Sequence, residues 1–148
     1  MRKTHQGIFK PKNPKKYNGN FNNIIYRSGW ELTVMIYLDK HPDVIQWCSE
    51  EIQIPYKSPV DNLIHRYFPD FLVKLRTTQG TIETRMIEVK PYKETIPPIP
   101  GKKSKKTFIN EIMTYGINQS KWIAAKRLCD SKGWIFSLLT ENDVNFMK

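Results

Sequence analysis

The chain has 148 residues, enough for one domain with a buried core, and its 39% hydrophobic and 26% charged residues are ordinary for a soluble globular protein. No apolar run approaches the ~18 residues of a membrane span, and the N-terminus lacks the apolar core of a signal peptide, so we expect neither a membrane protein nor one exported by such a signal. Lys and Arg total 24 against 14 Asp and Glu, a formal charge of +10, which favours a polyanion such as nucleic acid as partner; a solvated surface or a packing role is the alternative.

The first part of the chain, residues 1 to about 22, is basic, rich in Pro and Asn and poor in apolar residues. This composition predicts a flexible arm that could lie along a phosphate backbone, followed by a folded domain over 23–148. Cys48 and Cys129 have no metal-ligand spacing, and we interpret both as reduced, buried thiols of a cytosolic protein.

A helix is predicted to begin at Ser28. Ser28 fits an N-cap, Glu31 follows three residues later, and the helix should end at His41, because a proline follows it. The apolar stripe of this helix comprises Trp30, Val34, Tyr37 and His41.

Strands dominate the next part of the chain. Short strands are predicted at 44–48 and 51–57 with a turn over 58–62, and longer ones at about 66–76 and 81–90. The linker between the longer strands suits a hairpin turn in which Gly80 adopts positive φ.

The C-terminal part begins with a segment rich in Pro and Lys at 91–106, for which we predict no regular structure. A helix should follow over 107–132, capped by Gly133, then a buried strand at 134–140 and a short helix from Thr140. The predicted apolar face of the long helix comprises Ile112, Tyr115, Trp122, Ala125 and Cys129. This order of elements predicts an α/β fold, with a mixed central β-sheet flanked by helices.

The types and spacing of three residues, Asp70, Glu88 and Lys90, indicate which chemistry the protein could perform. Asp70 lies in an apolar strand, where carboxylates are rare, and Glu88 and Lys90 share one face of the next strand. If the strands pair, the two carboxylates converge and require a cation between them, and oxygen ligands select Mg²⁺ or Mn²⁺. Such a site suits phosphodiester hydrolysis, with Lys90 orienting the attacking water. An amphipathic strand that happens to expose a Glu and a Lys is the alternative.

Glu31 fits two roles. It stands where a capping-box glutamate reaches back to the backbone of Ser28, yet Met35 and Leu38 share its face, so it could instead turn inward as a third carboxylate.

The combination "RSGWE", "YFPDF" and "IEVKP" resembles the restriction-endonuclease-like superfamily with its PD-(D/E)xK signature. More narrowly, "FKPKNPKKY", "IIYRSGWEL", "EEIQIPY", "HRYFPDF" and "KWIAAK" resemble the head-completion nucleases of T-even-like tailed bacteriophages, over essentially the whole chain. The "PDF" strand and the C-terminal tail also resemble the transposition endonucleases of that superfamily.

The resemblance implies Glu31, Asp70 and Glu88 as metal ligands, the Val89 carbonyl as a further ligand and Lys90 as the catalytic lysine, with Mg²⁺ as cofactor and Mn²⁺ as a substitute. It implies a DNA endonuclease, with exonuclease activity left open, that trims packaged DNA before heads accept tails. Its place would be the host cytoplasm during virion assembly or a minor position in the virion, with phage head or neck proteins as partners and no membrane. The alternatives are a non-catalytic DNA-binding neck protein and a transposition- or junction-type endonuclease.

Further basic residues are candidates for contacts with the DNA backbone, without sequence specificity. In the arm and the loop they are Lys10, Lys12, Lys15, Lys16, Lys102, Lys103, Lys105 and Lys106. Arg66 and Lys121 are weaker candidates, since a solvated strand end and an ordinary polar helix face explain them as well. No Ser or Cys stands beside any of the three histidines, so covalent catalysis has no support.

Overall fold

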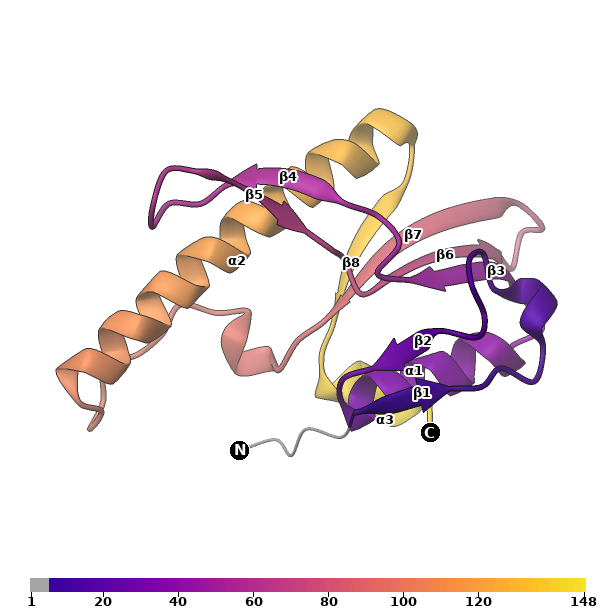
Figure 1. Ribbon diagram of the computed structural model, residues 1–148, viewed down its shortest axis with the longest axis horizontal. Coiled ribbons are helices and arrows are strands. Elements are labelled where there is room, and N and C mark those ends of the chain that lie inside the picture. Colours follow the sequence, from indigo (N-terminus) through magenta and orange to yellow (C-terminus); the bar gives the residue numbers. More distant parts are fainter. Residues whose placement is uncertain (1–5) are drawn as a thin grey trace.

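A computed structural model describes residues 6–148 and places a four-stranded mixed sheet at the centre of the molecule (Figure 1). The strand order is β3 (Val44–Ser49), β6 (Phe71–Arg76), β7 (Ile82–Val89) and β8 (Ile135–Leu139). β6 is antiparallel to both β3 and β7, and β8 runs parallel to β7. The predicted α/β fold with a mixed central sheet is therefore confirmed.

One face of the sheet is covered by the N-terminal elements and the short C-terminal helix (Figure 1). These elements are β1 (Gly7–Phe9), β2 (Ile24–Tyr26), α1 (Gly29–Lys40) and α3 (Glu141–Phe146). Val34 and Met35 of α1 are fully buried and share a core with Trp47, Phe71 and Val144. Burial of this apolar surface drives the packing of α1 onto the sheet.

The other face carries α2 (Lys105–Lys132) and a separate hairpin of β4 (Ile54–Lys57) and β5 (Ile64–Tyr67), which lies across the helix (Figure 1). A second core, formed by Ile54, Tyr56, Tyr67, Met86, Trp122, Ala125 and Cys129, joins these elements to the sheet. Among residues 6–148, no helix is both long and apolar enough to cross a membrane.

Helix ends and the hairpin turn follow the sequence signals. The Ser28 hydroxyl accepts a 3.1 Å hydrogen bond from the Glu31 N–H, and α1 ends before His41. Gly133 closes α2 with φ 71°, and Gly80 has φ 83° in the turn between β6 and β7.

The strand predicted at 66–76 is wrong in one respect, because it is broken between Tyr67 and Phe71. Tyr67 ends a strand that pairs with β4, whereas Phe71 begins a strand of the central sheet. Pro69 lies in the break. Proline has no backbone N–H group, and at this position outside the strands no ladder hydrogen bond is lost. Asp70 is thereby freed from strand pairing just before β6.

The predicted flexible arm needs correction within the described residues, since from residue 6 onward the segment packs on the domain; residues 1–5 lie outside them. Phe9 and Tyr17 are buried, and β1 pairs with β2. The buried Asp39 carboxylate at the end of α1 accepts hydrogen bonds from the main-chain N–H groups of Lys12 (2.9 Å) and Asn13 (3.0 Å). A buried carboxylate needs such partners, and here it fixes the segment that leads into the short 3-10 helix η1 (Pro14–Lys16).

The long helix begins at Lys105, two residues before the predicted start, because Ser104 caps it. Its predicted apolar face is correct at Trp122, Ala125 and Cys129, but Ile112 is 46% exposed. The N-terminal half of α2 extends beyond the sheet and finds no strand to pack on (Figure 1). The segment before it contains only the short 3-10 helix η2 (Tyr92–Glu94).

Candidate active site

Three carboxylates meet where β3 ends and β6 begins, beside the first turn of α1. Glu31, Glu50 and Asp70 each offer an oxygen atom, and these atoms all lie within 4.8 Å of one another. Two of the three, Glu31 and Asp70, are residues that the sequence predicts as ligands. Glu50 is not, so the structure brings an additional carboxylate into the candidate site.

Asp70 connects this group to the end of β7. Its carboxylate accepts a 2.7 Å hydrogen bond from the Val89 N–H, and its carbonyl accepts one of 3.2 Å from the Glu50 N–H. Desolvation, followed by the negative charges of Glu88 and Glu31, raises the pKa of Asp70 well above its usual range. The anionic carboxylate is thus disfavoured unless a positive charge joins it.

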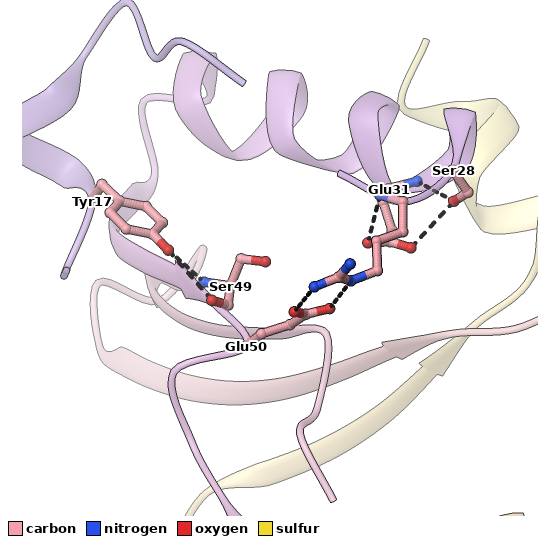
Figure 2. A network of polar contacts seen from close by, with 6 residues as sticks. Tyr17, Ser28, Glu31, Ser49 and Glu50 are labelled. Carbon is pink, nitrogen blue, oxygen red and sulfur yellow. Dashed lines mark hydrogen bonds and ion pairs between the residues drawn. The ribbon is translucent and has the colours of Figure 1, made fainter. Parts of the chain in front are cut away.

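Glu31 makes contacts at the start of α1 and also lies within the cluster of three carboxylates. Its carboxylate accepts hydrogen bonds of 3.4 Å from the Arg27 N–H and the Ser28 hydroxyl, and it faces Glu50 (Figure 2). The backbone partner is Arg27, one residue before the one predicted. Desolvation, with a contribution from the Glu50 charge, raises the pKa of Glu31. The hydrogen bonds that Glu31 makes at the helix start are long, and its side chain also belongs to the cluster of three carboxylates.

Glu50 follows β3 directly and has φ 55°, a left-handed conformation uncommon for residues other than glycine. Such strained residues concentrate at functional sites. Its two carboxylate oxygens accept hydrogen bonds of 3.1 Å from the Arg27 guanidinium, so an arginine lies beside the acidic group (Figure 2). The sequence signal that could have indicated Glu50 is an acidic residue placed immediately after a buried strand.

The Glu88, Val89 and Lys90 segment approaches the group from β7. Ile87 and Val89 are buried in the core beneath α1, whereas Glu88, 5% exposed, lies on the other face of the strand, as the alternation predicts. Glu88 is not one of the three carboxylates within 4.8 Å of each other, but its charge acts on Asp70. The Lys90 N–H donates a 2.9 Å hydrogen bond to the Leu139 carbonyl, so β8 fixes the backbone at this lysine.

The basic residues predicted to bind DNA occupy different environments. Lys16 donates hydrogen bonds to the carbonyls of Asp39 (3.0 Å) and His41 (2.8 Å), so its ammonium group caps the C-terminal end of α1. Lys103 forms a 2.7 Å ion pair with Glu111. The exposed candidates are Lys10, Lys12, Lys15, Arg66, Lys102, Lys105 and Lys106, whereas Lys121 is only half-exposed.

Comparison with known proteins identifies related nucleases. The chain is 40% identical over 142 residues to the head completion nuclease of Enterobacteria phage T4, covering 93% of this chain and 92% of that protein. Residues 41–141, which include Glu50, Asp70 and the Glu88–Lys90 segment, match the family described as TnsA-like endonuclease N terminal. The chain therefore belongs to the TnsA-like endonuclease family.

Proposed function

We propose that this protein is a metal-dependent DNA endonuclease that acts in phage head completion, cutting or trimming packaged DNA before heads and tails join. The observation that carries the proposal is the convergence of Glu31, Glu50 and Asp70 beside the start of the Glu88–Lys90 segment. Family membership supports the nuclease activity, and the name of the T4 relative supports the stage of assembly.

The donor set fits a hard divalent cation. Carboxylate oxygens are the ligands that Mg²⁺ prefers and that Mn²⁺ accepts, and the desolvation that raises the pKa of Asp70 and Glu31 makes an added positive charge favourable. We propose Glu31, Glu50, Asp70 and Glu88 as ligands, together with the carbonyl of Val89. When bound, such an ion supplies charge neutralisation at the scissile phosphate and lowers the pKa of a water molecule.

Side chains and main-chain groups of the protein have the remaining tasks. The Val89 N–H holds the Asp70 carboxylate at the end of β7, so two parts of the chain that are distant in sequence keep a fixed relation. Lys90, whose backbone is bound to β8, orients the attacking water and stabilises the extra negative charge of the transition state.

The exposed lysines and Arg66 contact the DNA backbone and add affinity without reading bases, because phosphates are the same at every position. Lys16 is left out of this set, since its ammonium group is bound to two carbonyls of its own chain. We place the protein in the host cytoplasm during virion assembly or as a minor virion component, with head or neck proteins as partners.

The family match favours one second candidate, an endonuclease that acts on transposon ends or DNA junctions. The DNA substrate separates the two: a junction enzyme should cut branched DNA much faster than linear duplex. A non-catalytic DNA-binding neck protein would need no convergence of carboxylates.

The test is an assay of the purified protein on linear, circular and branched DNA, with and without Mg²⁺. We expect cleavage only with the metal, and a loss of ~10³-fold or more in rate for Asp70→Ala, Glu88→Ala and Lys90→Ala. Asp130→Ala is the matched control, because Asp130 is an exposed carboxylate on α2. Equal cleavage by wild-type protein and the Asp70 variant would refute the proposal.

A further inference from the structure

Helix α2 places a second lysine on the face of the sheet opposite α1. The Nζ atom of Lys121 lies 5.8 Å from the ring centroid of Tyr56 and 5.6 Å from that of Tyr67. Both tyrosines are buried and belong to the β4–β5 hairpin that crosses the helix. The two aromatic rings therefore lie along one side of the ammonium group. This group is less solvated than that of an ordinary surface lysine.

The charges around Lys121 are those of the candidate active site. Desolvation and then repulsion by Lys90 lower the pKa of Lys121, and the carboxylates of Glu88 and Asp70 partly oppose this. No carboxylate among residues 6–148 lies close enough to form an ion pair with it. A partly desolvated cation without a paired anion is costly, and an anionic ligand would offset that cost.

Polar groups next to Lys121 are also incompletely satisfied. The Tyr67 hydroxyl and the Trp122 Nε1 atom are buried and make no hydrogen bond of good geometry to any of the described residues. The Tyr67 hydroxyl lies near the Glu88 carboxylate and the Trp122 ring nitrogen. Since buried polar groups are normally bonded, these two donors can bond a water molecule or a ligand that enters beside Lys121.

We propose that the ammonium group of Lys121 contacts a non-bridging oxygen of the phosphate that is cut, on the opposite side of the sheet from Glu31. The inference rests on the proposed nuclease function. A cation held in a desolvated, preformed position stabilises charge that develops in the transition state more than charge already present in bound DNA. Lys121 therefore differs from the exposed lysines of the 91–106 segment, which act on affinity.

Lys121→Met tests the inference, because it keeps the apolar stem beside Tyr56 and Tyr67 and removes the charge. The matched control is Lys126→Met on the same helix, where the side chain is 70% exposed and lies 3.8 Å from Asp130. Single-turnover cleavage at saturating protein separates the chemical rate from DNA affinity, which is measured without cleavage in Ca²⁺. We expect Lys121→Met to lower the rate by ~10²-fold or more and the affinity by less than ~3-fold, with Lys126→Met close to wild type in both.

Chemical rescue separates the charge from a folding effect. Lys121→Cys should be nearly inactive, and alkylation with 2-bromoethylamine, which restores an ammonium group at this position, should recover at least ~10-fold in rate. Cys48 and Cys129 are 4% and 0% exposed, so both are shielded from the reagent. Treated wild-type protein is the control for alkylation, and melting temperatures identify unfolded variants.

Two results would overturn the inference and leave the nuclease assignment intact. One is a cleavage rate for Lys121→Met within ~3-fold of wild type, and the other is a folded Lys121→Cys variant that alkylation does not reactivate. A wild-type protein that cuts no DNA with Mg²⁺ or Mn²⁺ would instead overturn the proposed function itself, and the proposed role of Lys121 with it.

Discussion

The carboxylate of Asp70 accepts a 2.7 Å hydrogen bond from the main-chain N–H of Val89, a residue 19 positions further along the chain. Antiparallel pairing of β6 with β7 brings the two together, since Phe71 lies opposite Ile87. The bond opposes part of the pKa increase that desolvation and neighbouring carboxylates cause at Asp70. The aspartate and the Glu88–Lys90 segment are therefore joined by a direct hydrogen bond as well as by the pairing of their strands.

Metal binding should stabilise the folded protein, because it relieves repulsion among Glu31, Glu50 and Asp70. At a Mg²⁺ or Mn²⁺ concentration 100 times the dissociation constant, linkage predicts about 2.7 kcal/mol, or roughly 5 to 10 °C in melting temperature. Thermal denaturation with and without metal measures this. Asp70→Asn should lose most of the shift while melting no lower than wild type without metal. A full shift in that variant would remove Asp70 from the ligands.

Glu50 offers a test that the sequence motif does not suggest. Glu50→Gln should raise the metal concentration for half-maximal cleavage by roughly 10-fold or more, because one carboxylate is lost. Glu51→Gln is the matched control, since this neighbouring glutamate is exposed and outside the group of three carboxylates.

Replacing Glu50 by glycine distinguishes backbone strain at this position from a role of the carboxylate in cleavage. Glu50→Gly should keep or raise the melting temperature, because φ 55° suits glycine, yet it should impair cleavage as Glu50→Gln does. Normal metal dependence in both variants would contradict a role for Glu50.

The proposed role of Glu31 as a metal ligand can be tested separately from its contribution to the helix cap. Glu31→Gln keeps the hydrogen-bonding shape and should change stability by about 1 kcal/mol or less, but cleavage should fall steeply with partial recovery at high Mn²⁺. Ser28→Ala is the converse change: it removes the cap at the Glu31 N–H and should cost about 1 kcal/mol while cleavage persists. Denaturant unfolding and cleavage rates measure the two effects, and full activity of Glu31→Gln in Mg²⁺ would exclude it as a ligand.

The basic residues should divide into two groups. Neutralising four lysines together, Lys102, Lys103, Lys105 and Lys106, should lower the slope of log affinity against log salt by ~2 to 4. We expect a value near ~2, because Lys103 already forms an ion pair with Glu111. Cleavage by this variant should recover at low salt, since the carboxylates are unchanged. An unaltered slope would show that the loop does not bind DNA.

Lys16→Met should instead act on stability. Removing its hydrogen bonds to the Asp39 and His41 carbonyls should cost about 1 to 2 kcal/mol and leave the salt slope unchanged. The neighbouring, exposed Lys15→Met is the control and should show the opposite pattern. A reduced slope for Lys16→Met at unchanged stability would restore Lys16 to the DNA-binding set.

Alkaline pH should destabilise the protein through Tyr17. Burial, more than any other cause, raises the pKa of Tyr17 to about 12, and its hydroxyl accepts a 3.1 Å hydrogen bond from the Ser49 N–H. A raised pKa in the folded state means that the contribution to stability is complete below the unfolded value of about 10 and is lost as the pH rises through about 12. Tyr17→Phe should be less stable at pH 8 but should lose less stability between pH 9 and 12. Parallel pH profiles for the two proteins would contradict this.

Local signals in the sequence determined much of the fold. Ser28 before an apolar-striped segment, His41 before proline, Gly80 in a hairpin and Gly133 after a helix act through short-range sterics and hydrogen bonds, so their consequences are readable without the rest of the chain. The proximity of Asp70 to the Glu88–Lys90 segment was predictable for a similar reason, since a hairpin brings the ends of adjacent strands together.

Only the tertiary structure decided which groups converge from distant parts of the chain. Glu50 joins Glu31 and Asp70 because β3 pairs with β6 and because Glu50, the residue after β3, adopts a left-handed conformation. An acidic residue after a buried strand is a local signal, but it does not indicate which other carboxylates lie beside it. Asp39 fixes the N-terminal segment by accepting hydrogen bonds from two backbone N–H groups. Every non-proline residue has such a group, so the residue types in the sequence do not reveal this contact. Lys121 lies beside Tyr56 and Tyr67 because the β4–β5 hairpin crosses α2. The free energy that stabilises this arrangement comes from burial of Tyr67 and Trp122, which are distant in sequence.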